Sequence, residues 1–383
     1  MNHRLSRGWL AAVAVAVAAA MVAAPAFSAP DIAVGQLSPF TNLPVPEASE
    51  LNQGSRAFFN GLNKAGGIRD RKVTLIEFDD RYSADGFAEQ FPKAMEKKVV
   101  ALLNPIGSPA IKRMLDDKML DSADVVVLNA IPGAEALRNP GHSKFFHLRA
   151  GDKQQIEKII NHARTLGMTR LSVLYQDIPI GTSGWDVAQK EVATAKGIEI
   201  KGVKSNLELP QVAIAAKEVA AQGPQGVLIT GAPRFTVDAI AALRKAGVTQ
   251  SIFVLSYVQP GLLIKVAGLE AARGVGISQT YPNANGRVLP LMRDFQAAMK
   301  ASYPEIQFYT PFHLEGYLAA RTLGEALKRS KDTGELTGAS VARSLKAMGE
   351  LDFGGFRVNF TKSNIGSTFV DIGVIGSDGK LRY

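Results

Sequence analysis

Two successive sets of alternating strand and helix segments constrain the fold of this chain more than any other feature. The first set contains apolar strand segments, expected at 32–37, 73–78, 99–103 and 125–128. The second set repeats the pattern, with strands expected at 171–175, 198–203, 226–230 and 252–255. Helices that can serve as crossover connections lie between them, at 49–65, 83–97, 111–120, 154–166, 184–196, 212–222 and 236–246. Because strands connected in this way form parallel sheets with helices on both faces, the sequence predicts an α/β chain with two doubly wound, Rossmann-like lobes.

The last third of the chain does not form a third lobe of this kind. It contains helical segments at 288–302 and 311–329, and it closes with strands at 356–360 and 368–375. Because the second lobe already has its helices, we expect the two long helices to cover the first lobe and the tail to return to the second. Three crossings near residues 147, 280 and 354 would then form a hinge. The predicted domains are a first lobe of 27–147 with 281–353, and a second lobe of 148–280 with 354–383.

The first 26 residues are typical of a signal peptide for export. Arg4 and Arg7 precede an uncharged, mostly apolar run at 9–24, and small residues follow at Ala26 and Ser28. The run is shorter than the roughly 20 residues that a membrane-spanning helix needs, which disfavours the alternative of a membrane anchor. We expect cleavage after Ala26, with cleavage after Ser28 as the alternative.

The composition limits the cellular compartment and the kinds of partner that we expect for this chain. The chain has no cysteine that could carry a lipid after the signal peptide, so we expect a free protein in the periplasm of a Gram-negative bacterium. Its formal net charge of +9 is spread over short basic clusters without interleaved aromatic residues. This pattern does not support a nucleic-acid groove; it suits an ordinary solvated surface or a mild attraction for anionic ligands.

The sequence contains no motif that supports an enzyme. It has neither G-x-G-x-x-G after a strand nor G-x-x-x-x-G-K-[ST], and it lacks the nucleophile elbow G-x-S-x-G. His142 and His147 lie at a spacing that fits no common zinc motif. We therefore expect no catalysis, no bound metal and no cofactor.

Short motifs along the mature chain resemble those of one known family. They are IAVG at 32–35, NKAGGI at 63–68, FDD at 78–80, EGYLAA at 315–320 and DGK at 378–380. In this order after a signal peptide, they resemble the leucine/isoleucine/valine-binding proteins and their relatives, the type I periplasmic substrate-binding proteins of ABC transporters. The resemblance covers essentially the whole mature chain. It implies the type I periplasmic binding protein fold, with two lobes joined by a three-segment hinge and a ligand held in the cleft between them.

The resemblance places one ligand-binding loop of the first lobe after the third strand. This loop contains Asn104, Gly107 and Ser108, and Ser108 falls at the position where the family has a hydroxyl group. A hydroxyl and backbone N–H groups at the start of a helix form an anion site. In the alternative interpretation Ser108 only caps that helix, although both roles can hold together.

A second ligand-binding loop is implied after the fourth strand, and it contains Ala130 and Ile131. Members of the family that bind amino acids usually have a threonine where this chain has Pro132. Proline supplies neither a hydroxyl nor an N–H group, so half of the expected carboxylate clamp is missing or this loop has been rebuilt.

The second lobe departs further from receptors that bind amino acids. Ile180 falls near the position of the family's common aromatic residue, and Tyr257 falls where the ammonium-binding carboxylate is expected. A buried ammonium group without a carboxylate costs several kcal/mol in order of magnitude, which disfavours a standard α-amino acid. Tyr257 suits an aromatic or neutral group on a ligand that carries an acid. Phe40, Tyr175 and Tyr281 are also expected to face the cleft.

These features together predict a binding protein rather than an enzyme. We expect a monomer that captures a small apolar or aromatic carboxylate by hinge closure and delivers it to the membrane permease of an ABC importer. Two alternatives stay open at this point. The closed protein could instead be read by a signalling system, or the ligand could be a branched-chain amino acid.

Overall fold

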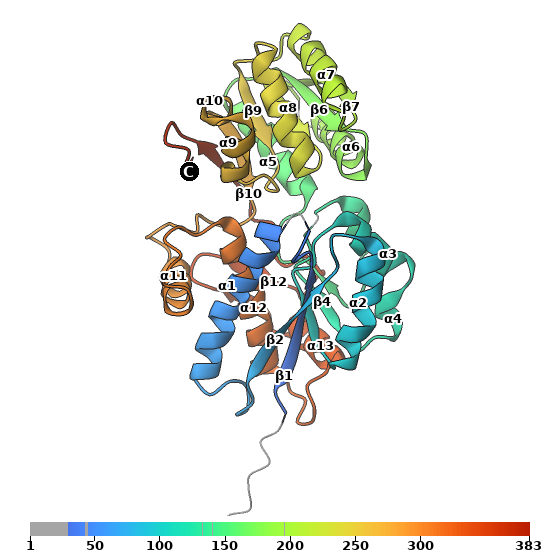
Figure 1. Ribbon diagram of the computed structural model, residues 1–383, viewed down its shortest axis with the longest axis vertical. Helices are drawn as coiled ribbons and strands as arrows, with labels where there is room; N and C mark the ends of the chain where they lie inside the picture. Colours follow the sequence, from blue (N-terminus) through green and yellow to red (C-terminus); the bar gives the residue numbers. More distant parts are fainter. Residues whose placement is uncertain (1–29, 43–44, 132, 140, 195) are drawn as a thin grey trace, which may run out of the picture.

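Two α/β lobes, each built on its own sheet, lie one above the other along the longest axis of the molecule (Figure 1). The computed structural model describes residues 30–42, 45–131, 133–139, 141–194 and 196–383. The predicted signal peptide and Pro132 therefore lie outside the described residues. The two sheets and their helices confirm the predicted fold class.

The first lobe contains a five-stranded parallel sheet in the order β2-β1-β3-β4-β5. Its strands are β1 Ile32–Ser38, β2 Val73–Asp79, β3 Ala101–Leu103, β4 Val126–Leu128 and β5 Phe145–Phe146. Strands β3 and β4 are short runs of fully buried aliphatic residues, as expected for central strands covered on both faces.

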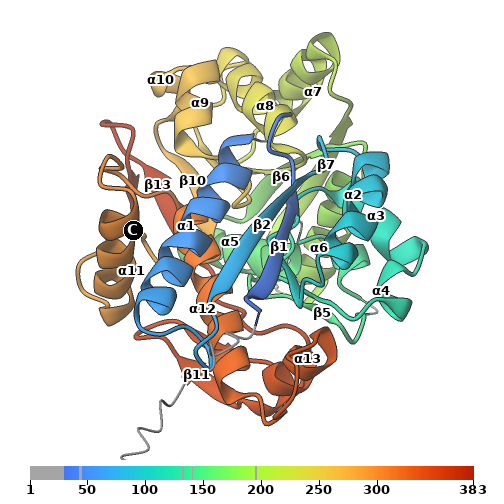
Figure 2. The same cartoon turned by 60° about the horizontal axis from the view of Figure 1, so that its bottom comes forward.

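Helices from both the first and the last third of the chain cover this first sheet. One face packs against α1 Val45–Lys64, α11 Pro290–Ser302, α12 Pro311–Arg329 and α13 Gly338–Ala347. The other face packs against α2 Ala84–Glu96, α3 Ser108–Asp116 and α4 Met119–Ser122. Figure 2 shows α1 and α12 side by side on the same side of β1 and β2. A short 3-10 helix, η1, follows at Glu135–Leu137.

The second lobe contains a seven-stranded mixed sheet in the order β14-β13-β10-β9-β8-β6-β7. The parallel strands are β6 Arg170–Gln176, β7 Glu199–Ser205, β8 Gly226–Thr230, β9 Ser251–Val254 and β10 Val275–Gln279. The antiparallel strands β13 Asp371–Ile375 and β14 Leu381–Arg382 complete one edge. Its helices are α5 Asp152–Thr165, α6 Pro179–Thr194, α7 Leu209–Ala221, α8 Pro233–Lys245, α9 Pro260–Ala267 and α10 Leu269–Ala272. None of the helices in the described ranges is long and apolar enough to cross a membrane.

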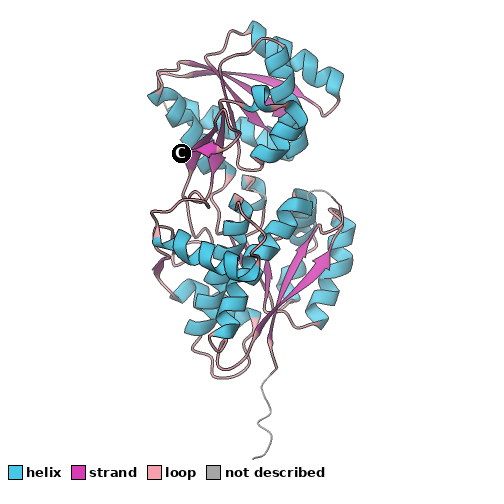
Figure 3. Cartoon of the chain, turned by 60° about the vertical axis from the view of Figure 1, so that its left-hand side comes forward, coloured by secondary structure: helices cyan, strands magenta, loops and turns pink. Residues whose placement is uncertain are grey.

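Three loop segments connect the lobes, and two of them run side by side. The backbone N–H of His147 donates to the carbonyl oxygen of Asn364 at 2.7 Å, and that of Gly366 donates to His147 at 2.8 Å. Figure 3 shows that the chain passes between the lobes mainly as loops. A hinge of three segments is therefore present, with its third segment near residue 366.

The antiparallel pair β11 Glu350–Asp352 and β12 Arg357–Asn359 belongs to the core of the first lobe. Phe356, Val358 and Phe360 are buried there among residues of α12 and α13. The sequence placed the third crossing near residue 354. The packing of these three side chains leads us to propose that the first lobe extends to about residue 366.

Helices α1 and α12 approach each other closely because glycine stands at both contact points. A Cβ atom on Gly54 would lie 1.9 Å from the carbonyl oxygen of His313, and one on Gly316 would lie 2.0 Å from that of Leu51. Ser55 donates a hydrogen bond to the carbonyl oxygen of Gly316 at 3.0 Å. Glu315, the neighbour of Gly316 at this close crossing, is buried and lies 3.6 Å from Arg149.

Candidate functional site

A cavity of about 850 Å³ lies between the two lobes, at the carboxyl ends of their parallel strands. Loops that follow β2, β3 and β4 form its wall in the first lobe, and loops that follow β6, β8 and β9 form its wall in the second. Ligands of open α/β sheets bind at this end of the strands. A second hollow of about 740 Å³ beside Trp185 is lined by the second lobe alone. The cavity that joins both lobes is therefore the candidate site.

The wall of the cavity is mainly apolar. The aliphatic and aromatic side chains that line it include Ile106, Ile131, Leu137, Ile178, Ile180, Pro233, Tyr257 and Phe312. The charged residues Lys112 and Asp116 pair with each other on α3. Glu47, on the first turn of α1, also lines the cavity, and burial raises the pKa of its carboxyl group against an opposing hydrogen bond from its own backbone N–H. Such a wall favours a ligand with a large apolar part.

The start of α3 supplies polar groups to the cavity. Gly107 is the N-cap residue, no side chain caps this helix, and Ser108 is its first residue. The interpretation in which Ser108 caps α3 is therefore wrong. Gly107 has φ 114°, a left-handed conformation that glycine adopts without strain, and its N–H donates to the carbonyl oxygen of Ile131 at 3.0 Å. The two loops predicted to bind the ligand are thus held together by backbone hydrogen bonds.

Tyr257 forms part of the cavity wall, but its hydroxyl group is used inside the protein. The hydroxyl donates to Oδ1 of Asp152 at 2.5 Å and accepts from the backbone N–H of Gly133 at 2.7 Å. Asp152 also donates its backbone N–H to the carbonyl oxygen of Gly133 at 2.9 Å. These three hydrogen bonds join a loop of the first lobe to the start of α5 and to the loop that follows β9. Tyr257 therefore presents its ring, rather than its hydroxyl proton, to a ligand.

A buried arginine supports this part of the cavity from behind. The guanidinium of Arg149 lies 5.1 Å from the centre of the Tyr257 ring, and its Nη2 donates to the Ser256 hydroxyl at 2.5 Å. Its Nη1 lies 3.6 Å from Oε1 of Glu315 on α12. Arg149 thus contacts the second lobe and the first lobe at once, next to the first crossing. Both charged side chains are almost fully buried, so each depends on the other.

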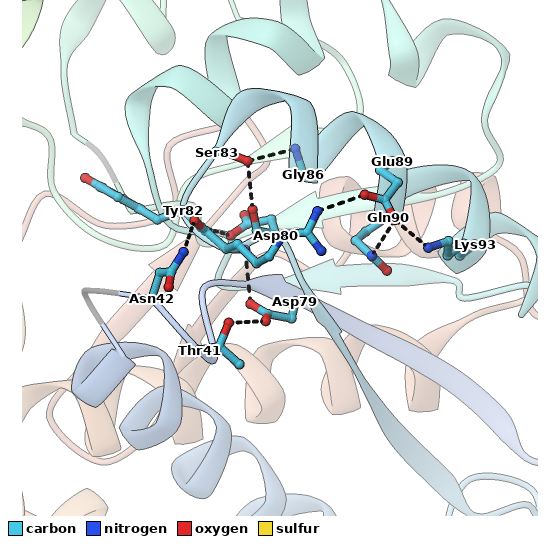
Figure 4. A network of polar contacts seen from close by, with 11 residues as sticks. Thr41, Asn42, Asp79, Asp80, Tyr82, Ser83, Gly86, Glu89, Gln90 and Lys93 are labelled. Carbon is cyan, nitrogen blue, oxygen red and sulfur yellow. Dashed lines mark hydrogen bonds and ion pairs between the residues drawn. The ribbon is translucent and has the colours of Figure 1, made fainter.

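Figure 4 shows a polar network in the loop after β2, from which the side chain of Tyr82 extends. Tyr82 lines the cavity. Arg81 and Tyr82 have φ values of 53° and 57°, so two successive residues are left-handed. The backbone N–H of Arg81 donates to Asp79 at 3.0 Å, and that of Tyr82 donates to Asp80 at 2.9 Å. A left-handed conformation costs a residue with a side chain roughly 1–2 kcal/mol, so these carboxylates maintain a strained loop.

Glu50 connects the lobes at another edge of the site. Its Oε2 accepts hydrogen bonds from Gln259 of the second lobe and from Thr310 of the first, both at 2.9 Å. Burial, with a smaller contribution from the nearby Glu47, outweighs the two hydrogen bonds and raises the pKa of Glu50 to about 7. The charge on Glu50 is therefore sensitive to pH near neutrality.

The structure brings only part of the predicted site together. Five of the predicted residues line the cavity: Gly107, Ser108, Ile131, Ile180 and Tyr257. The other five occupy different surroundings. Asn104, Ala130 and Tyr281 are buried, and the hydroxyl of Tyr281 donates to Asn129 at 3.0 Å. Tyr175 stacks on Trp185 with ring centres 5.5 Å apart, and half-buried Phe40 packs into a core cluster while its N–H donates to Asp79.

Sequence reasoning missed several residues of the cavity wall. Tyr82, Glu47 and Phe312 line it, and none of them lies in the loops that the resemblance implied. The pair Asp79-Asp80 was a possible signal of the turn that carries Tyr82, because the two aspartates accept the backbone N–H groups of the two left-handed residues that follow. Across the described ranges, acidic and histidine side chains form no cluster of three that could hold a metal ion.

Residues 31–374 match a family model described as periplasmic binding protein. An extracellular ligand-binding receptor from Verminephrobacter eiseniae is 58% identical, covers 92% of this chain and 100% of its own, and superimposes with a TM-score of 0.88. A substrate-binding periplasmic protein from Ralstonia solanacearum is 26% identical, with coverages of 92% and 99% and a TM-score of 0.82. A possible leucine/isoleucine/valine-binding protein from Rhodopirellula baltica shares the fold at 19% identity, with coverages of 94% and 98% and a TM-score of 0.81. Among curated proteins, none matches the chain significantly.

Proposed function

This chain belongs to the periplasmic binding protein family, a family of ligand-binding receptors, and on that premise we propose that it captures a small apolar or aromatic carboxylate for an ABC importer. The ligand binds in the cavity between the lobes and stabilises their closed arrangement, which the membrane permease recognises. The protein acts as a monomer in the periplasm, without a cofactor and without catalysis. Cleavage of the predicted signal peptide leaves a chain that begins at Phe27 or Ala29.

The composition of the cavity wall is the observation that carries this proposal. Most of the wall is aliphatic or aromatic, while one end is formed by Gly107 and Ser108 at the start of α3. The Gly107 N–H is bonded to Ile131 and Pro109 has no N–H, so the N–H groups of Ser108 and Ala110, with the positive end of the helix dipole, are the groups that would attract an anion. An apolar body with one acidic group fits this arrangement.

The surroundings of Tyr257 disfavour a standard α-amino acid. Its hydroxyl proton is committed to Asp152, and the Asp152 carboxylate does not line the cavity. The position at which similar receptors have an ammonium-binding carboxylate thus presents an aromatic ring. An ammonium group placed there would be buried without an ionic partner, at a cost of several kcal/mol in order of magnitude.

A thermal-shift screen followed by calorimetry tests this proposal. The panel contains aromatic carboxylates, aliphatic carboxylates of increasing length, their amides and the branched-chain amino acids. We expect carboxylates to raise the melting temperature and their amides to have little effect. The variant Ile180→Glu should abolish the shift, because it places a negative charge on the cavity wall, whereas the exposed Leu166→Glu in the same lobe should not.

The role of Ser108 has its own measurement on the best carboxylate of the panel. If its hydroxyl donates to the ligand, Ser108→Ala should weaken binding by about 1.5–3 kcal/mol, roughly ten- to a hundredfold. The melting temperature without ligand should change little, because no side chain caps α3. Unchanged affinity would remove Ser108 from the ligand contacts.

A further inference from the structure

Tyr82 has a conformation that its sequence alone does not favour. It is a bulky residue with φ 57°, preceded by Arg81 with φ 53°. Residues in sparsely populated conformations persist where the surrounding structure fixes them, and they cluster at binding sites. The strained turn therefore requires an explanation.

The loop is fixed on both sides of the strained residues. Asp80 is fully buried, and its Oδ1 accepts the backbone N–H of Tyr82 at 2.9 Å. Before the turn, Asp79 accepts from the Thr41 hydroxyl at 2.5 Å as well as from Arg81. After the turn, Ser83 caps α2 by accepting from the N–H of Gly86 at 2.9 Å. This network fixes the direction in which the side chain of Tyr82 points away from the backbone.

The ring of Tyr82 lies against the start of α3, where we propose that the acidic group of the ligand binds. It lines the cavity, and a Cβ atom on Gly107 would lie only 3.1 Å from its Cε2 atom. The ring therefore packs directly over the backbone at the start of α3. In Figure 4 it extends away from the polar network, and none of the interactions drawn there reaches its hydroxyl group. The residue remains 45% exposed, so part of its surface is accessible to a ligand.

We propose that Tyr82 is a specificity residue of this cavity: its ring covers the end formed by Gly107 and Ser108 and selects ligands that carry a flat, apolar group beside their acid. This inference rests on the proposed function, since it concerns the same cavity. An aromatic ring offers a flat face on which another aromatic group stacks favourably, which a saturated chain cannot match. The ligand class thereby narrows from apolar carboxylates to aromatic ones.

The fluorescent anion 8-anilinonaphthalene-1-sulfonate is a suitable probe, because it joins aromatic rings to one acidic group. Tyr82→Asn removes the ring, and asparagine tolerates the left-handed conformation, so the loop should keep its course. We expect this variant to bind the probe about tenfold more weakly, whereas Tyr82→Phe should stay within about twofold of the natural protein. Phe308→Ala removes an exposed aromatic ring of the first lobe that does not line the cavity, and it should leave binding unchanged.

Two further variants make every outcome decisive. Ile180→Glu should abolish probe binding if the probe occupies the cavity, and Tyr82→Gly repeats the ring deletion if Tyr82→Asn has a lowered melting temperature. Probe binding that is absent, or insensitive to Ile180→Glu, would contradict the proposed function itself. Binding that responds to Ile180→Glu but is equal in the natural protein, Tyr82→Asn and Tyr82→Gly would overturn the role of Tyr82 alone.

Discussion

The hydroxyl of Tyr257 donates a hydrogen bond to Asp152 at 2.5 Å while it accepts one from the N–H of Gly133. All three groups are buried, and Oδ2 of Asp152 has no hydrogen-bond partner among the described residues. Burial raises the pKa of Asp152 to about 6, and the hydrogen bond from Tyr257 opposes that rise. A side chain of the cavity wall is thus tied to the hinge.

Tyr257→Phe should therefore destabilise the protein more than it weakens ligand binding. The change leaves Asp152 and the Gly133 N–H without their shared partner, at a cost of about 1–3 kcal/mol. The ring that faces the cavity is retained, so affinity should change by less than about threefold. Urea unfolding measures the first effect, with Tyr175→Phe as a control in the same lobe. An unchanged free energy of unfolding would contradict the structural role of the hydroxyl.

Arg149→Met should be among the more harmful single changes in the protein. It leaves the Glu315 carboxylate buried without its charged partner, which costs about 3–5 kcal/mol. The double variant Arg149→Met with Glu315→Gln should be more stable than Arg149→Met alone, because no uncompensated charge remains. Thermal unfolding of the two variants compares them directly. If the double variant is the less stable one, the ion pair does not explain the burial of Arg149.

The crossing of α1 and α12 predicts opposite effects for two glycine substitutions. Gly316→Ala places a Cβ atom against the backbone of Leu51, so the helices must separate, at a cost of about 1–3 kcal/mol or more. Gly61→Ala lies in α1 with no atom within 4 Å of the new Cβ, so it should stabilise the helix by up to about 1 kcal/mol. Melting temperatures of both variants test the contact. Equal effects of the two substitutions would show that the close approach is not needed.

Glu50 should make stability depend on pH near neutrality. Its pKa of about 7 in the folded protein lies above the ordinary value of 4.5, so the folded state binds the proton more tightly. Its stabilising contribution is complete below about pH 4.5 and is lost as the pH rises through 7. Glu50→Gln imitates the protonated side chain, so it should gain stability relative to the natural protein at pH 8 and lose that advantage at pH 5.

Comparison with the Glu50→Gln variant isolates this group from its titratable neighbours. Glu47 has its pKa raised by burial, whereas burial lowers the pKa of His313, beside Thr310, to about 4. The His313 contribution is the same in the natural protein and in the variant, so it cancels in the difference, whereas the repulsion between Glu47 and Glu50 is lost in the variant and counts with the titration of Glu50. Urea unfolding at the two pH values gives this difference directly. A difference between the proteins that does not vary with pH would exclude the titration of Glu50.

The periodic spacing of apolar residues predicted the sheets and the long helices well, because an element that is buried on one face has apolar residues at regular intervals. The helix expected at 311–329 is found with those bounds. Strand β10 was missed because Gly276 and Ser278 interrupt its apolar pattern. Gly276 is needed there, since a Cβ atom would lie 2.8 Å from the ring of Phe253. The need for glycine at position 276 comes from packing between neighbouring strands, which cannot be read from the sequence.

The site was less predictable than the fold for a related reason. The loops after β3 and β4 could be placed by resemblance, and Gly107, Ser108 and Ile131 line the cavity. Tyr82 could not be placed at the cavity from the sequence, because the spacing of apolar residues does not reveal two successive left-handed residues. Tyr281 was expected at the cleft, but its hydroxyl group bonds to Asn129 in the interior. Aromatic residues at strand ends look alike in sequence, and their hydrogen-bond partners decide where they point.

The central claim is that the cavity receives an apolar or aromatic acid rather than an amino acid. Calorimetric titration of the mature protein with leucine, in parallel with the best carboxylate from the thermal-shift panel, tests it most directly. We predict micromolar or tighter binding of the carboxylate and at least about hundredfold weaker binding of leucine, since the Asp152 carboxylate beside Tyr257 does not line the cavity and cannot receive the ammonium group. Micromolar or tighter binding of leucine would contradict the account.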